Sequence, residues 1–192
     1  MKKVLLLIFA FVCCTWVARK SYAQQEQVKF PPLDVSPMDM SYYPPNYPAA
    51  KLRGNAGQLI MRVIYSRPQK KGRTIFGGLE PFGKVDRLGA NEADELDVFS
   101  PVTIGGKTLQ PGRYTFYAIF QPDKWTFIVN AETDTWGAFG YDPKKDIVRV
   151  DVPVQHMSEP VEALSMVFQK TDKGADLVIG WDTTMVRVPF TF

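Results

Sequence analysis

The residues best suited to bind a ligand gather between positions 66 and 93, a stretch rich in basic side chains and glycine. Its basic residues are Arg67, Lys70, Lys71, Arg73, Lys84 and Arg87, and they are followed by Asn91 and Glu92. Guanidinium groups beside an amide and a carboxylate can recognise a carboxylate or a sugar, and loops on a rigid scaffold often carry such sites. The candidate ligand-binding residues of this stretch are Arg73, Lys84, Arg87, Asn91 and Glu92.

A structural interpretation of the same stretch stays open. Arg87 and Glu92 can pair with each other, and the glycines can simply serve tight turns. Residues 78–84 also fit the glycine and lysine spacing of a phosphate-binding loop. However, Val85 stands where a Ser or Thr must hold the metal, and Gly89 follows too soon for a helix whose amides could hold phosphate. Nucleotide binding is therefore not expected.

A second candidate site lies at residues 136–143, where three aromatic residues fall within eight positions. Aromatic faces in loops can stack on sugar rings, which makes Trp136 and Tyr141 candidate binding residues. More often, aromatic residues at such a place close the end of an apolar core.

Patterns for catalysis or metal binding are weak. His156 is the only histidine and no G-x-S-x-G motif accompanies it, so a serine hydrolase is not indicated. The two cysteines, Cys13 and Cys14, lie near the N-terminus, and residues 130–134 match a calcium loop only loosely. We therefore predict neither a metal site nor a cofactor. The acids of residues 92–97 could supply the two carboxylates of a glycan hydrolase, but their separation in space decides that.

The first 23 residues have the pattern of an export signal. Lys2 and Lys3 precede an apolar run over residues 4–17, and the small residues Ser21 and Ala23 suit a cleavage site. The apolar run is shorter than the roughly 20 residues of a membrane-spanning helix. We predict a protein exported to the periplasm or the cell exterior, with no transmembrane segment after signal removal.

The net charge changes when this leader is removed. Four of the 23 basic residues and none of the 20 acidic residues lie in residues 1–23, so the remaining chain is close to neutral. The formal charge of +3 for the whole chain is therefore no argument for binding nucleic acid.

From residue 57 onward, apolar residues recur at every second position in short runs separated by glycine and proline, as in residues 59–65, 114–120 and 164–168. Such alternation is typical of strands with one buried face. No stretch shows ten or more residues at the helical period, and at most residues 90–96 form a turn or two of helix. We predict an all-β fold, an antiparallel β-sandwich or jelly-roll-like single domain over residues 57–192.

Residues 24–56 carry six prolines and three tyrosines. This spacing disfavours a regular helix or a central strand. We expect a proline-rich arm that lies over the domain or acts as a linker, with a tyrosine–proline ligand for another protein as the alternative.

Several motifs of the chain resemble those of one known family. They are Ile75-Phe76-Gly77-Gly78-Leu79, Pro81-Phe82-Gly83-Lys84-Val85, Gly89-Ala90-Asn91-Glu92-Ala93, Pro111-Gly112-Arg113-Tyr114 and Trp136-Gly137-Ala138-Phe139. Over about residues 57–192 the chain resembles a bacterial family of domains of unknown function, number 2911 in that series. Its members usually carry Trp where this chain has Asp86, and Thr near Leu88 and Asp94. The resemblance implies an exported envelope protein of the Bacteroidetes type with a β-rich domain, and it supplies no catalytic residues.

The function that these patterns favour is non-catalytic binding of a glycan or another envelope component, such as an envelope protein. A glycan-active hydrolase with a carboxylate pair and a structural partner of an envelope complex stay open as alternatives. Enzymatic activity is not the expectation.

Overall fold

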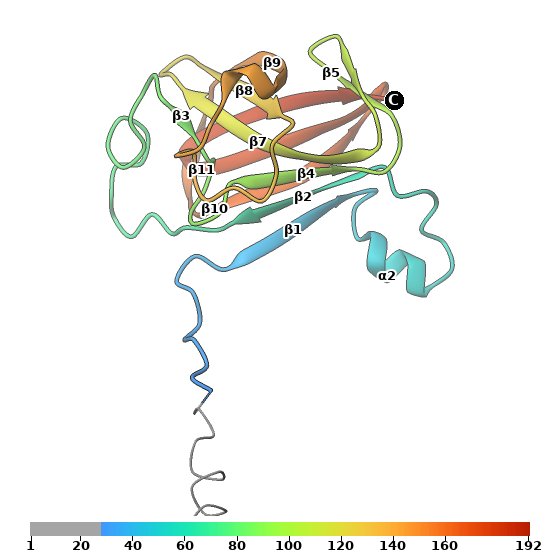
Figure 1. The fold of residues 1–192 in the computed structure, drawn as a ribbon, viewed down its shortest axis with the longest axis horizontal. Helices are drawn as coiled ribbons and strands as arrows, with labels where there is room; N and C mark the ends of the chain where they lie inside the picture. The colour runs from blue at the N-terminus through green and yellow to red at the C-terminus, as the bar shows by residue number, and fades with distance from the viewer. Residues whose placement is uncertain (1–27) are drawn as a thin grey trace, which may run out of the picture. The chain divides into compact units, whose positions relative to one another are not determined.

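The computed structural model describes residues 28–192. The predicted leader, residues 1–23, and the first four residues of the predicted arm lie outside the described residues. The strands are β1 (Met38–Tyr43), β2 (Met61–Ser66), β3 (Val85–Asp86), β4 (Asp94–Val98), β5 (Val102–Ile104), β6 (Lys107–Leu109), β7 (Gly112–Phe120), β8 (Lys124–Asn130), β9 (Asp146–Pro153), β10 (Gln155–Thr171) and β11 (Gly174–Thr191). A short helix, α2 (Tyr47–Leu52), and a 3₁₀ turn at Pro143–Lys145 complete the elements (Figure 1).

The strands form two antiparallel sheets. One sheet has the order β1-β2-β4-β7-β8-β9, and β3 pairs with the part of β7 that β4 leaves free. The other sheet has the order β10-β11-β5-β6. In Figure 1 the long β10 and β11 lie behind β4, β7 and β8. The predicted all-β, sandwich-like fold is confirmed.

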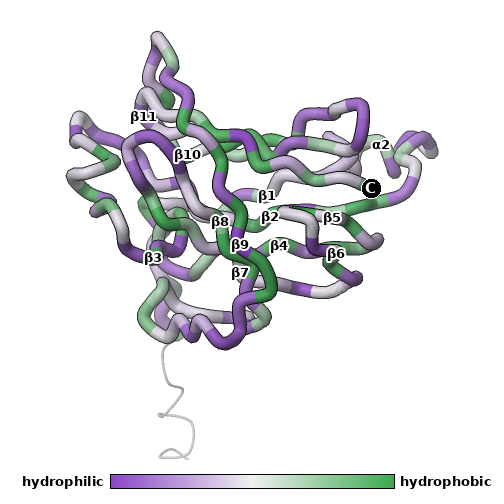
Figure 2. Tube along the Cα trace, turned by 90° about the horizontal axis from the view of Figure 1, so that it is seen from above, coloured by the Kyte–Doolittle hydropathy of each residue, from purple (hydrophilic) through white to green (hydrophobic). Residues whose placement is uncertain are grey.

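One continuous apolar core is built from both sheets. Its largest fully buried side chains include Trp125, Trp181, Phe116 and Phe127, and each such side chain stabilises the fold by about 1.5–3 kcal/mol. The apolar residues of the predicted alternating runs 114–120 and 164–168 supply much of this core. Figure 2 shows the apolar stretches along the strands and the hydrophilic stretches in the turns.

A second, small apolar cluster covers the outer face of the larger sheet. Ala93, Tyr117 and Ile128 are buried there, and Ala138 and Tyr141 pack against them. Period-two alternation places Tyr117 and Ile128 on the face opposite to the core, so their burial depends on the loop that carries Ala138 and Tyr141. This loop is therefore part of the packed structure.

Two local expectations differ from the structure. Residues 94–98 form β4 rather than a helical turn, because they pair with β2 on one side and β7 on the other. Within the predicted arm, residues 47–52 form α2, with a proline in its first turn. A proline at that position loses no helical hydrogen bond. The other regular element of this region, β1, is an edge strand. Edge strands tolerate prolines, because one side of the strand makes no ladder hydrogen bonds.

Candidate functional site

A tight loop over residues 74–80 fixes the first wall of the candidate site. Ile75 is fully buried, and the Phe76 ring packs on Phe120 and Trp125 with ring centroids 5.0 and 4.7 Å apart. The backbone amide of Glu80 donates to the carbonyl of Ile75 at 2.9 Å, and the amide of Gly77 donates to the carbonyl of Glu80 at 2.9 Å. The loop is therefore held at both ends, and the Glu80 side chain has a fixed origin.

Glycine is required in this loop. Gly77 has a φ of +81°, and a Cβ there would lie 2.6 Å from the Phe82 ring. A Cβ on Gly78 would lie 2.5 Å from the carbonyl oxygen of Thr74. The glycines thus serve close packing. The chain continues into β3 rather than into a helix whose amides could hold phosphate.

Beside this loop lies a pocket of about 410 Å³, here called the arginine pocket. Its walls are formed by Val35, Ser36, Pro68, Gln69, Lys71, Arg73, Leu79, Glu80, Arg87, Gly89 and Ala90. Three of these side chains are cationic, namely Lys71, Arg73 and Arg87. The pocket therefore offers several donors for an anion.

These cations are available to a ligand. Within residues 28–192, Arg62, Arg67, Arg113, Arg149 and Arg187 each have a carboxylate within 4 Å, whereas no carboxylate lies that close to Arg53, Arg73 or Arg87. Arg73 uses its Nε and Nη2 atoms on the carbonyls of Lys70 and Gln69. Arg87 uses only Nε, on the carbonyl of Gly89 at 3.2 Å. Two of the three arginines without a carboxylate partner thus line this one pocket.

The pocket also contains a buried acid, Glu80, whose side chain is only 9% exposed. Burial and the nearby carboxylate of Asp86 raise the pKa of Glu80 to about 8, although Arg87 and Arg73 act in the opposite direction. The two carboxyl groups are in hydrogen-bonding contact, and Asp86 Oδ1 accepts from the amide of Leu88 at 2.7 Å. Glu80 is therefore the protonated partner at neutral pH.

A second buried acid lies behind the pocket wall. Asp94 is 1% exposed, and a Cβ on Gly89 would lie 3.4 Å from its Oδ1 atom. Burial raises the pKa of Asp94 well above its ordinary value, with a further contribution from Asp86. The amide of Ser66 and the charge of Arg87 favour the ionised form, but no hydrogen bond of ordinary geometry reaches either carboxyl oxygen.

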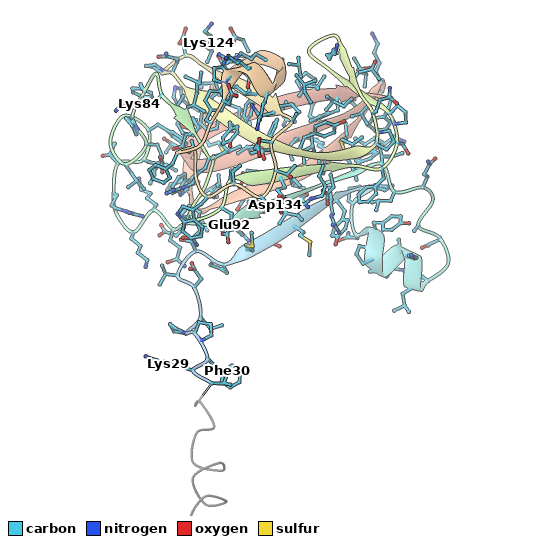
Figure 3. All side chains as sticks on the ribbon, viewed as in Figure 1. Lys29, Phe30, Lys84, Glu92, Lys124 and Asp134 are labelled. Atoms are coloured by element: carbon cyan, nitrogen blue, oxygen red, sulfur yellow. The ribbon has the colours of Figure 1, made fainter. Side chains whose placement is uncertain are left out.

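A second pocket of about 260 Å³, here called the phenylalanine pocket, adjoins the same segment. It is lined by Pro81, Lys84, Val85, Asp86, Arg87, Ala138 and Phe139. Phe139 is 86% exposed, so its ring faces are free for stacking. Figure 3 shows Lys84 and Glu92 at the end of the domain from which the loop over residues 67–84 projects.

The two stretches singled out in the sequence meet in the structure. Residues 91–93 run beside residues 135–137: the amide of Gly137 donates to the carbonyl of Asn91 at 3.0 Å, and the amide of Ala93 donates to the carbonyl of Thr135 at 3.0 Å. Glu92 and Trp136 form an isolated antiparallel bridge. The guanidinium of Arg87 lies against Gly137, where a Cβ would be 3.2 Å from Nη1.

Some candidate residues face this region and others have structural roles. Arg73 and Arg87 line the arginine pocket, and Lys84 lines the phenylalanine pocket. Trp136 is 60% exposed and lines neither pocket, but it precedes Gly137, which lies against Arg87. Asn91 donates to Asp34 at 3.1 Å. Glu92 is exposed and makes no ion pair with Arg87, so the structural pairing of those two residues is not found.

Tyr141 belongs to the packed structure. Its hydroxyl donates to Asp146 at 2.7 Å and accepts from Arg149 at 2.6 Å. Its ring meets Tyr117 edge to face at 5.3 Å. Burial and the hydrogen bond to Asp146 raise its pKa to about 12. Tyr141 thus closes the outer apolar cluster, and it lines neither of the two pockets.

Lys71, Glu80, Asp86 and Phe139 were not predicted as binding residues. Glu80 and Asp86 are six positions apart, and the turn at residues 82–83 between them brings their carboxyl groups together. The one signal that pointed to Asp86 was its departure from the family pattern. Conversely, Arg67 and Lys70 of the basic stretch are held by Asp39 at 2.9 Å and by Asp182 at 2.6 Å.

The carboxylates considered for hydrolysis do not form a catalytic pair. Glu95 and Asp97 are held by Arg113 and Arg62, each at 2.6 Å, and Asp94 is sealed in the interior. The Glu80 and Asp86 carboxyls are in contact, whereas glycosidase carboxylates stand about 5–10 Å apart to flank the scissile bond.

Two kinds of feature are absent from the part of the chain that the structure describes. In residues 28–192 no group of three or more His, Cys, Asp or Glu side chains is arranged to hold a metal ion. Over the same residues no helix has the length and apolar character needed to cross a membrane. Of the loosely calcium-like residues 130–134, Glu132 is in an ion pair with Lys145, and Asp134 with Arg113.

Comparison with known proteins gives one match. Residues 47–190 match the family model described as "Protein of unknown function (DUF2911)", while no curated protein and no solved structure matches the chain. The match covers most of the chain and begins at α2. It includes all residues of both pockets except Val35 and Ser36, which precede β1. The chain therefore belongs to the DUF2911 family of proteins of unknown function.

Proposed function

We propose that this protein is a non-catalytic binding module that holds a carboxylate-bearing glycan, or another anionic envelope component, in the arginine pocket. The observation that carries the proposal is the convergence of Lys71, Arg73 and Arg87 on one pocket, none of them in an ion pair within the described residues. Arg62 and Arg113, by contrast, are held by carboxylates.

The donors and aromatic rings of the site favour a ligand that carries a carboxylate on a sugar ring. Guanidinium groups bind carboxylates through paired N–H donors, and Arg87 keeps both of its Nη groups free of other hydrogen-bond acceptors among the described residues. The exposed Phe139 ring lines the phenylalanine pocket with Lys84 and Arg87, and exposed Trp136 precedes Gly137, which lies against Arg87. Such rings suit the apolar face of a sugar. Glu80, when neutral, does not repel an anion.

We propose further that the protein acts outside the cytoplasm, in the periplasm or at the cell exterior. The support is the basic, apolar and small-residue pattern of residues 1–23. Glycans and other envelope components would be accessible in that compartment.

The binding proposal can be tested with galacturonate and galactose, which differ at a carboxylate. We expect calorimetry to show binding of galacturonate, and weaker or no binding of galactose. Arg73→Ala should lower the affinity for galacturonate about tenfold, the loss expected for one hydrogen bond to a charged group. Arg73 is exposed, so the variant should fold.

Arg53→Ala is the matched control. Arg53 is also an exposed arginine without a carboxylate partner, but it lines neither pocket. Equal losses in the two variants, or equal binding of galactose and galacturonate by the wild type, would contradict the proposal. Arg87→Lys provides a second test, because it keeps the charge and removes the paired donors.

A further inference from the structure

The arginine pocket and the phenylalanine pocket share one partition. Arg87 is part of the wall of both pockets. Glu80 lines the first, Asp86 lines the second, and their carboxyl groups are in hydrogen-bonding contact. The pockets are therefore neighbours, separated by one arginine side chain and one carboxyl pair.

The phenylalanine pocket has its own set of binding groups. Lys84 has no carboxylate within 4 Å among residues 28–192, so it can meet a second anion. Phe139 presents an exposed ring, and Pro81 and Ala138 add apolar surface. A cation beside an exposed aromatic ring suits a sugar ring that carries a carboxylate.

The groups between the two pockets, Arg87 with the Glu80 and Asp86 carboxyls, do not repel an anionic ligand that lies across them. Asp86 and Arg87 are of opposite formal charge, and the carboxyl of Glu80 is in hydrogen-bonding contact with Asp86. Burial together with Asp86 raises the pKa of Glu80 to about 8, so the three groups sum to no net charge near pH 7. Arg73 and Arg87 face Glu80 from the ligand side, and Asp94 lies behind Gly89.

We propose that the two pockets are adjoining subsites for one acidic oligosaccharide of at least two sugar units. One unit places its carboxylate among Lys71, Arg73 and Arg87. The next unit lies across Arg87, with its ring against Phe139 and its carboxylate near Lys84. The proposal rests on the proposed function and adds to it the ligand class and the minimum ligand length.

A series of galacturonate oligomers of one to four units tests this arrangement by calorimetry. Once the first unit is bound, the second is held close to its subsite, so we expect the dimer to bind at least about tenfold more tightly than the monomer. Units beyond those that the two pockets hold should add little. Phe139→Ala should lower the affinity for the dimer about fivefold, as the loss of one ring contact predicts, and should leave the affinity for the monomer unchanged.

Phe99→Ala is the matched control, because Phe99 is another exposed phenylalanine and lines neither pocket. Lys84→Ala tests the same subsite by a second variant. It should weaken binding of the dimer and leave binding of the monomer unchanged. Equal affinities for monomer and dimer, or equal effects of Phe139→Ala and Phe99→Ala, would overturn the two-subsite proposal. If the monomer still binds and depends on Arg73, the proposed function stands by itself. If no member of the series binds the folded wild type, both proposals are wrong.

Discussion

At the scale of single residues, Glu80 links the fold to pH. Its backbone is held by hydrogen bonds to Ile75 and Gly77, and its carboxyl is buried beside Asp86. Burial disfavours the ionised form of Glu80, and the contact with the Asp86 carboxyl adds repulsion when both groups are ionised. The native state therefore retains a proton that the unfolded chain releases at lower pH.

This proton predicts how stability depends on pH. The folded protein keeps the Glu80 proton up to about pH 8, while the unfolded chain loses it near the ordinary value for glutamate. Between these values the unfolded state binds fewer protons at this site, so Glu80 makes the free energy of unfolding fall as pH rises, by roughly 1 kcal/mol per pH unit, and this contribution is complete above pH 8. Chemical denaturation from pH 5 to 9 measures this slope.

Glu80→Gln should make the slope shallower, because glutamine can donate to Asp86 and does not ionise, while buried Asp94 still contributes. The variant should thus be more stable than the wild type at pH 9, and the difference should shrink toward pH 5. Glu92→Gln, at an exposed glutamate of the same segment, is the control. An unchanged slope in Glu80→Gln would contradict the raised pKa of Glu80.

At the scale of elements, the 74–80 loop and the loop over residues 134–141 position the site. The first is anchored by Ile75 and Phe76 in the core. The second is joined to residues 91–93 by backbone hydrogen bonds and covers Tyr117 and Ile128. Neither loop has a regular repeat of its own, so each is ordered by what it packs against.

Glycines in the first loop allow a matched test. Gly77→Ala adds a Cβ 2.6 Å from the Phe82 ring at a φ of +81°, whereas Gly72→Ala, at a φ of +71°, meets no atom within 4 Å. Both carry the cost of a positive φ, about 1 kcal/mol, and only Gly77→Ala adds a steric clash. Thermal unfolding should therefore show a clearly larger loss for Gly77→Ala, together with weaker uronide binding. Equal losses would contradict this account of the loop.

At the scale of the whole molecule, two sheets that share one core provide a scaffold to which both loops are fixed. The core is built almost entirely from apolar side chains of alternating strands. After residue 23 the chain has no cysteine, so packing rather than disulfides must hold this scaffold together.

The export proposal makes a prediction for the whole chain. Protein isolated from its native cells should begin near Gln24, because cleavage would follow the small residues that end with Ala23. N-terminal sequencing or intact mass measurement checks this. Ala23→Arg should block cleavage and leave a longer product. A native protein that begins at Met1 would contradict the proposal.

The sequence by itself determined the all-β class and most of the core. Period-two alternation depends only on the geometry of a strand, so residues 114–120 and 164–168 reveal their buried faces without knowledge of their partners. The motifs of the basic, glycine-rich stretch likewise indicated the family, and the same stretch supplies Arg73, Lys84 and Arg87 to the two pockets. Residues 94–98 show the limit: their own propensities were ambiguous, and pairing with β2 and β7 made them a strand.

Only the tertiary structure decided which polar residues form the site. Arg67 and Arg87 look alike in the sequence, but Asp39 pairs with the first and no carboxylate pairs with the second. Tyr141 and Phe139 are two positions apart, yet one is held by Asp146 and the other is exposed in a pocket wall. Glu80 meets Asp86 through a loop closed by core packing. Ion pairing, burial and pocket formation depend on residues distant in the chain, and no local pattern encodes those distances.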